Sequence, residues 1–112
     1  MSNCLFCRMI AGEIKAKVAY EDDDLLAIHD INPQAPVHLL VIPKRHVEKV
    51  SSLQAQDAGL IEKVVRGAQK IAAQNHWEDF RLVFNNGAGA GQSVFHIHLH
   101  LLSGRPLHWP PG

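Results

Sequence analysis

The sequence of 112 residues has few cysteines, no long apolar run and no excess of either charge. Two cysteines form at most one disulfide bond, which excludes a small secreted fold held by several bridges. Eleven Lys plus Arg balance 11 Asp plus Glu, which argues against a nucleic-acid binder with a basic surface. No apolar run approaches the roughly 20 residues that span a bilayer, and no secretory apolar segment stands near the first residue, so we expect a cytoplasmic protein.

The remaining composition is that of an ordinary globular protein. Hydrophobic residues make up 46% and charged residues 20%, which excludes a disordered chain. A chain of this length buries roughly two-thirds of its extended surface, which is enough for a hydrophobic core that needs no disulfide bonds to hold it together. We therefore expect a single domain that spans residues 1–112.

The apolar pattern predicts two helices and five strands. Apolar positions recur at helical spacing from about Gln54 to Gln74, which predicts the one long helix, and Ser51 with Gln54 offers a capping box near its start. A short helix is predicted at 5–10, and strands at 18–21, 25–29, 37–42, 81–85 and 94–102. Because consecutive strands flank the long helix on both sides, we expect an α+β fold with a mainly antiparallel five-stranded sheet.

Three of the eight histidines alternate with apolar residues in the run His96-Ile97-His98-Leu99-His100. Successive side chains of a strand point to opposite faces, so the three imidazoles share one face. The apolar residues between and beside them, from Phe95 to Leu101, share the face that packs on a core. Two interpretations stay open: alternate histidines can ligate zinc, or one imidazole can attack phosphorus while neighbouring N–H groups stabilise the added charge.

A small, polar, glycine-rich stretch at residues 85–93 precedes these histidines. Backbone N–H groups in such a loop can hold a phosphate, and Ser93 can donate a hydrogen bond to a leaving group. The stretch is neither a Walker loop nor a Rossmann fingerprint, and taken alone it fits an ordinary hairpin loop. Its position beside three histidines favours the phosphate site.

Cys4 and Cys7 stand at Cys-x-x-Cys spacing. In a cytosolic chain this spacing indicates a metal site, a redox site, or two reduced cysteines without a ligand.

Several motifs together resemble the histidine triad superfamily of nucleotide hydrolases and transferases. The most specific is the run His96-Ile97-His98-Leu99-His100-Leu101-Leu102, and further matching segments lie at 20–22, 28–38, 41–46 and 91–94. The tail from Gly104 to Gly112 is similar to the branch called histidine triad nucleotide-binding proteins. The resemblance covers nearly the whole chain and is weakest along the long helix, where only the pattern fits.

The resemblance implies a purine nucleoside phosphoramidate hydrolase that releases AMP or GMP from P–N linked amines. His98 would attack the α-phosphorus and form a nucleotidyl-histidine, which water then hydrolyses. His100 would contact phosphate oxygens, Ser93 would assist the leaving group, and His38 would support the triad. His96 completes the triad, and no catalytic metal is expected.

The same resemblance implies the nucleotide site. Asp30 would accept hydrogen bonds from the ribose, since ionised carboxylates only accept, although an Asx turn before Asn32-Pro33 also explains it. An apolar slot would hold the purine, with plain core packing as the alternative for Phe6 and Ile28. The residues implied to bind the nucleotide are Leu5, Phe6, Ile28, Asp30, Ile31, Asn85, Gly91, Gln92, Ser93, Val94, His98 and His100.

In bacterial relatives of the wider superfamily, a Cys-x-x-Cys pair joins two histidines to bind zinc. The matching residues here are Cys4, Cys7, His46 and His96, which implies a structural Cys₂His₂ site without an open position. His96 would then be a ligand and not a catalyst. Members of the branch are homodimers whose tails reach toward the partner's site, which would place Trp109 there.

Three other functions remain open at this point. A dinucleoside polyphosphate hydrolase has a similar triad, although the tail argues against it. A purine-nucleotide-binding adaptor would bind AMP without turnover. A zinc-binding module without catalysis would need the metal to occupy His98 and His100.

Overall fold

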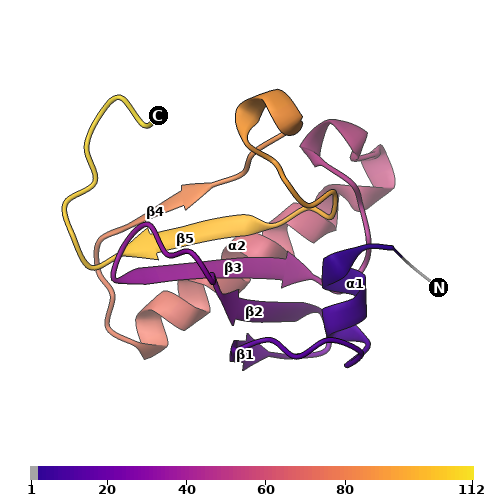
Figure 1. Ribbon diagram of the computed structural model, residues 1–112, viewed down its shortest axis with the longest axis horizontal. Helices are drawn as coiled ribbons and strands as arrows, with labels where there is room; N and C mark the ends of the chain where they lie inside the picture. The colour runs from indigo at the N-terminus through magenta and orange to yellow at the C-terminus, as the bar shows by residue number, and fades with distance from the viewer. Residues whose placement is uncertain (1–2) are drawn as a thin grey trace.

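A five-stranded antiparallel sheet organises residues 3–112, the part of the chain that this computed structural model describes. The strand order is β1-β2-β3-β5-β4, so β1 and β4 form the two edges (Figure 1). The strands are β1 Val18–Glu21, β2 Leu25–His29, β3 Val37–Pro43, β4 Phe80–Val83 and β5 Leu99–Ser103, and the helices are α1 Leu5–Ile10 and α2 Ala58–Gln74. The expected α+β class, with one long and one short helix, is confirmed.

The two helices cover opposite faces of the sheet, which explains why β2 and β3 consist mainly of buried apolar residues (Figure 1). Leu25 and Ala27 of β2 face α2, whereas Leu26 and Ile28 face α1. The residue Gly67 lets α2 approach closely, because a Cβ there would lie 2.2 Å from Leu25 Cδ1. Both faces of the central strands are therefore used, and each face carries its own core.

The start of the long helix differs from the expectation. The α-helix begins at Ala58, after single turns of 3-10 helix at Val50–Ser52 and Ala55–Asp57. The capping contact runs from Gln54 N–H to the Asp57 carboxylate, 2.8 Å, and does not involve Ser51. Asp57 is 4% exposed and also forms an ion pair with Arg45. The capping box therefore belongs to the 3-10 turn Ala55–Asp57, directly before α2.

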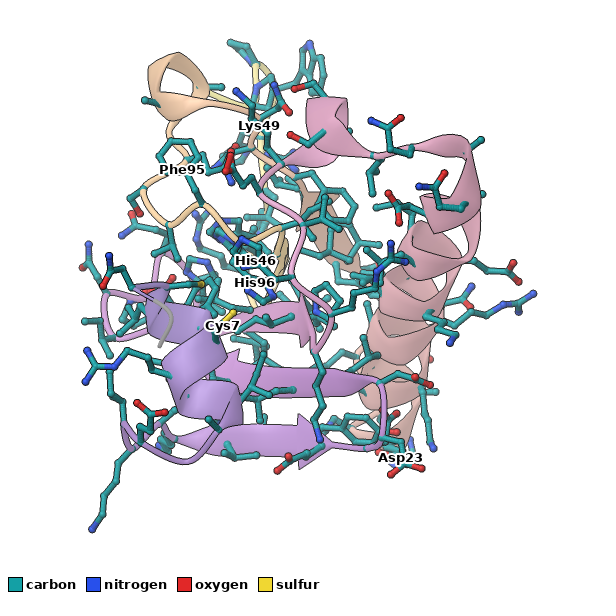
Figure 2. All side chains as sticks on the ribbon, turned by 90° about the vertical axis from the view of Figure 1, so that its right-hand side faces the viewer. Cys7, Asp23, His46, Lys49, Phe95 and His96 are labelled. Carbon is teal, nitrogen blue, oxygen red and sulfur yellow. The ribbon has the colours of Figure 1, made fainter. Side chains whose placement is uncertain are left out.

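The last strand also begins later than expected. Regular pairing starts at Leu99, although Ile97 N–H already donates to the Val47 carbonyl, 2.7 Å. Phe95 is 43% exposed and does not join the apolar core, contrary to the prediction (Figure 2). Leu99 and Leu101 do pack in the core beside α2. Within residues 3–112, neither helix has the length and apolar character needed to cross a membrane.

Candidate functional site

A cavity of about 270 Å³ opens between α1, β2 and the turn at residues 91–94. All residues that were predicted to bind a nucleotide line it, except Asn85 and Gln92. Four larger hollows, of about 290 to 820 Å³, include none of the three alternating histidines among their described lining residues. The smaller cavity, which His98 and His100 line, combines an apolar wall with polar groups, as small-molecule sites do.

Sequence reasoning missed three lining residues, Met9, His29 and Leu40. Met9 lies four positions after Leu5 and so shares its face of α1. Leu40 is the register partner of Ile28 on β3. These two could have been found from helical and strand spacing.

His98 is buried at the cavity with one ring nitrogen fixed by the backbone. Its Nδ1 lies 2.8 Å from the carbonyl oxygen of His96, and because a carbonyl only accepts, Nδ1 carries the proton. The lone pair is therefore on Nε2. Burial lowers the pKa of His98 below its ordinary value, which keeps the ring neutral near pH 7. Phe6 meets the ring edge-on, with centroids 5.0 Å apart, and fixes its position.

His38 determines which nitrogen of His100 carries a proton. Gln34 N–H donates to His38 Nδ1, 3.0 Å, so the proton of His38 is on Nε2. That Nε2–H points at His100 Nδ1, 2.9 Å away, and leaves His100 with its own N–H on Nε2. The contact follows from the sheet, because His38 pairs with Leu102 and so lies diagonally across from His100 on the same face.

His100 is held neutral as well. Burial, followed by the neighbouring His98 and His38, lowers its pKa to about 4. Burial also lowers the pKa of His38. A neutral ring with a fixed N–H donor suits contact with a phosphate oxygen.

Asp30 forms the Asx turn and also lies at the cavity, whereas its contact with a ribose remains a prediction. Its Oδ1 accepts from Asn32 N–H, 2.8 Å, which is the Asx turn. Its Oδ2 lies 3.5 Å from His38 Nε2, and the residue lines the cavity. The turn therefore holds the carboxylate at the cavity wall.

The glycine-rich loop forms one rim of the cavity. Gly91 has φ +98°, in the left-handed region that favours glycine, and places Ser93 and Val94 at the cavity. A Cβ at Gly91 would lie 3.6 Å from the Asn85 amide nitrogen, so Asn85 supports the loop. The Gln92 side chain is 3% exposed and bonds within the protein, which leaves only its backbone for a nucleotide.

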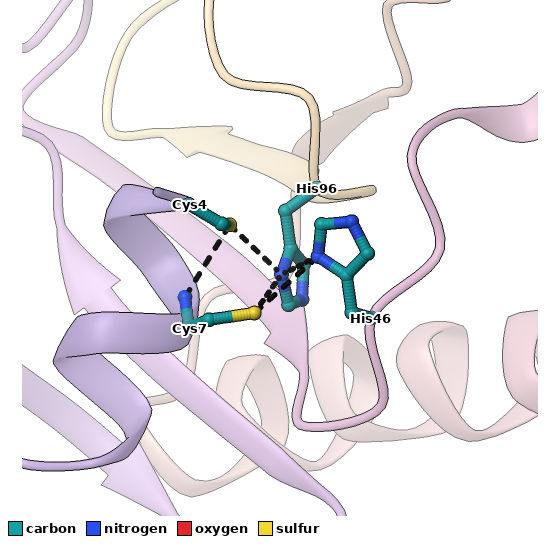
Figure 3. Close-up of side chains that lie close together, drawn as sticks. All are labelled: Cys4, Cys7, His46 and His96. Carbon is teal, nitrogen blue, oxygen red and sulfur yellow. Dashed lines mark hydrogen bonds between the residues drawn. The ribbon is translucent and has the colours of Figure 1, made fainter. Parts of the chain in front are cut away.

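Cys4, Cys7, His46 and His96 come together beside this cavity (Figure 3). Their ligand atoms all lie within 4.8 Å of one another. Cys7 Sγ is 3.3 Å from His46 Nδ1 and 3.5 Å from His96 Nδ1, and the two Nδ1 atoms are 3.1 Å apart. A tetrahedral zinc separates sulfur and nitrogen ligands by roughly 3.3–3.8 Å, so the four side chains fit such an ion.

The ring of His96 is oriented for this role. Its Nε2 donates to the Pro43 carbonyl, 2.7 Å, so its lone pair is on Nδ1, which faces the sulfur of Cys4 at 3.4 Å. Burial lowers the pKa of His96 to about 4, which keeps the ring neutral as metal ligands are. Figure 2 shows Cys7, His46 and His96 gathered between α1 and the rest of the molecule.

A second group, Asp30, His38 and His100, also brings three ligand atoms within 4.8 Å. This group does not fit a metal, because His38 Nε2 carries a proton while Gln34 N–H occupies Nδ1. The nitrogen that would face the ion thus has no lone pair to give.

The comparisons with known proteins agree with this geometry. The family model described as "Scavenger mRNA decapping enzyme C-term binding" matches residues 3–106. An uncharacterized HIT-like protein of Synechocystis is 49% identical over 109 residues, 96% of each chain. The crystal structure of a HIT family hydrolase from Legionella pneumophila has a TM-score of 0.95 at 48% identity, covering 98% of this chain and 100% of that one.

One of the similar solved structures is described as zinc-bound. The crystal structure of a Zn-bound histidine triad family protein from Mycobacterium smegmatis has a TM-score of 0.80 at 33% identity. The match covers 92% of this chain and 76% of that chain.

Proposed function

Since this chain belongs to the histidine triad (HIT) family, we propose that it is a purine nucleoside phosphoramidate hydrolase acting through a nucleotidyl-histidine intermediate. One observation carries the proposal. The bond from His98 Nδ1–H to the His96 carbonyl leaves the Nε2 lone pair of a buried, neutral imidazole at the cavity. Such a ring can attack phosphorus without a separate base.

The reaction proceeds in two balanced steps. His98 Nε2 bonds to the α-phosphorus while the P–N bond breaks, and the leaving nitrogen takes up one proton from solvent through the Ser93 hydroxyl, so that it departs as a neutral amine. Water then attacks the phosphorus, the N–P bond to His98 breaks, AMP or GMP is released, and the proton that water loses returns to solvent. Neutral His100 donates to a phosphate oxygen through the N–H that His38 fixes on its Nε2.

The cavity wall supports a purine nucleoside. Phe6, Ile28 and Leu40 are buried apolar residues of this wall, and Ile31 is fully exposed at its rim. The Asp30 carboxylate at the same wall accepts from ribose hydroxyls. Apolar surface for a flat base beside a few fixed polar groups is typical of nucleotide sites.

We further propose a structural zinc at Cys4, Cys7, His46 and His96. When bound, the ion would fix α1 against the segment before β5 by four protein ligands. The support is the donor set itself: two sulfurs and a lone pair on His96 Nδ1, together with His46, converge on one point.

We also propose a homodimer in which the tail approaches the partner's site. β4 is an edge strand that can extend the sheet, and Trp109 is 82% exposed on a tail that leaves the sheet (Figure 1). Light scattering of the purified chain tests it: twice the monomer mass supports a dimer, and the monomer mass contradicts it.

The test of the function uses adenosine 5′-phosphoramidate as substrate and chromatography to detect AMP. The parent should release AMP, and His98→Ala should lower kcat by at least about 10³-fold because the nucleophile is lost. His76→Asn, at an exposed position just after α2 and outside the lining of the cavity, is the control. Faster turnover of a dinucleoside polyphosphate would favour that substrate class, and tight AMP binding without cleavage would favour an adaptor.

A further inference from the structure

A buried glutamine holds the loop that borders the cavity. The side chain of Gln92 is 3% exposed, and its Oε1 accepts from Gly87 N–H, 2.8 Å. Its Nε2 donates to two carbonyl oxygens, that of Glu48 at 2.8 Å and that of Val94 at 3.1 Å. The amide therefore uses both of its N–H donors and one acceptor inside the protein.

These three bonds join both ends of the loop to a second segment. Gly87 stands at the start of the loop and Val94 at its end, so the amide closes the loop on itself. Glu48 lies two residues after His46, in the segment whose Val47 carbonyl accepts from Ile97 N–H. The Gln92 amide thereby links the loop to residues 46–48, and this segment is bonded to Ile97, the residue before His98.

The loop has few side chains that fix its place in the molecule. Gly87 and Gly91 both have positive φ, at +92° and +98°, and among residues 87–94 only Val94 packs against an apolar cluster. The backbone bonds of residues 90–92 stay within the turn, since they run to the Gly87 and Ala88 carbonyls. Asn86 Oδ1 accepts from Ser51 N–H, 2.8 Å, on the outer side. The Gln92 amide is the buried contact next to Ser93.

We propose that Gln92 is a positioning residue for the phosphate-binding part of the site, an inference that rests on the proposed function. Its side chain does not line the cavity and its hydrogen bonds are used within the protein, so it does not contact the substrate. It acts by holding Ser93 and the backbone N–H groups of residues 91–94 where the phosphate and the leaving amine bind.

The effect of changing Gln92 on ligand binding should therefore depend on whether the ligand carries a phosphate. Removing the amide should weaken AMP binding and lower kcat, while the affinity for adenosine, which has no phosphate, should stay unchanged. A merely structural residue would weaken both ligands alike when the fold loosens. The ratio of the two affinities separates positioning from general stability.

The experiment compares Gln92→Glu and Gln92→Met with Gln69→Glu, a matched change on the exposed face of α2. A carboxylate would face two carbonyl oxygens, and a thioether would leave them without donors. We expect kcat on adenosine 5′-phosphoramidate and the preference for AMP over adenosine to fall about ten-fold or more in both Gln92 variants. Both values should stay parental in Gln69→Glu. Parental values in the Gln92 variants would overturn the inference.

A measurement on the parent keeps the inference testable if both variants fail to fold. Amide hydrogen exchange should show the Gly87 N–H protected, because it is bonded to Gln92 Oε1. Rapid exchange at Gly87 would overturn the inference. The proposed function fails in a different way, when the parent neither cleaves the phosphoramidate nor prefers AMP over adenosine.

Discussion

Two groups of histidines lie side by side and differ in where their protons are. In the cysteine-histidine cluster, His96 Nδ1 and His46 Nδ1 face the same point as the two sulfurs. In the group of His38, His98 and His100, N–H donors and lone pairs alternate along the contacts. Converging lone pairs suit a cation, and alternating donors and acceptors suit a reacting phosphate.

Backbone groups, and not the histidines themselves, determine which ring nitrogen carries the proton. His96 and His98 each donate to a carbonyl, but His96 does so through Nε2 and His98 through Nδ1. The lone pair on His96 Nδ1 therefore faces the two cysteine sulfurs, and the lone pair on His98 Nε2 faces the cavity. One run of alternating residues thus presents lone pairs in two directions, because neighbouring carbonyls select different ring nitrogens.

Removing a metal ligand should have the largest effect on this comparison. His46→Ala should lose the bound zinc and lower the free energy of unfolding by a few kcal/mol, or roughly 10 °C in Tm, because metal binding contributes to folding. Metal analysis and thermal unfolding of the protein purified with zinc measure both. The Michaelis constant should also rise, because Cys4 precedes α1 directly and Cys7 lies in it, next to the cavity residue Phe6.

His98→Ala sharpens the same comparison, since it belongs to the other group. It should keep one zinc per chain while losing turnover. Zinc loss from His98→Ala, or full zinc retention by His46→Ala, would contradict the separation of the two groups.

Changing His38 should have a smaller effect that is confined to catalysis. His38→Phe keeps a ring but removes the N–H that fixes His100. The lost orientation should lower kcat about 10-fold to 100-fold, since one buried hydrogen bond corresponds to about 1–3 kcal/mol. Zinc content should remain parental, as metal analysis would show. An unchanged kcat would mean that the proton on His100 is not set by His38.

Local patterns were enough to predict the sheet, the two helices and the face on which the histidines gather. The period of two in the run from His96 to Leu101 brought His98 and His100 to one side, with ring centroids 5.1 Å apart. The fold class followed from the order of strands around α2. These features depend on residues close in sequence, so a single sequence contains them.

The features that the sequence pattern did not predict depend on contacts between residues that are not adjacent in the sequence. The protonated nitrogen of His38 is set by a backbone N–H, which every non-proline residue has, so no residue type marks it. Phe95 turns outward because regular pairing begins only at Leu99. The capping box forms between Gln54 and Asp57, and not at Ser51, and the buried Asp57 carboxylate also pairs with Arg45.

The smallest expected effect is the part of the pH dependence of the free energy of unfolding that comes from His100. His100 has a pKa of about 4 in the folded protein, below the ordinary value of 6.5. Between these values the unfolded chain binds a proton that the folded chain does not, so the free energy of unfolding falls as pH drops from 6.5 toward 4. Because the ring is only half-buried, we expect His100→Asn to reduce this fall by on the order of 1 kcal/mol. Urea unfolding at pH 7 and pH 4.5 measures it, with His76→Asn at an exposed position after α2 as control. An identical fall in His100→Asn and the parent would mean that the folded protein does not hold this ring neutral, which would contradict the proposed role of His100 as a neutral N–H donor to a phosphate oxygen.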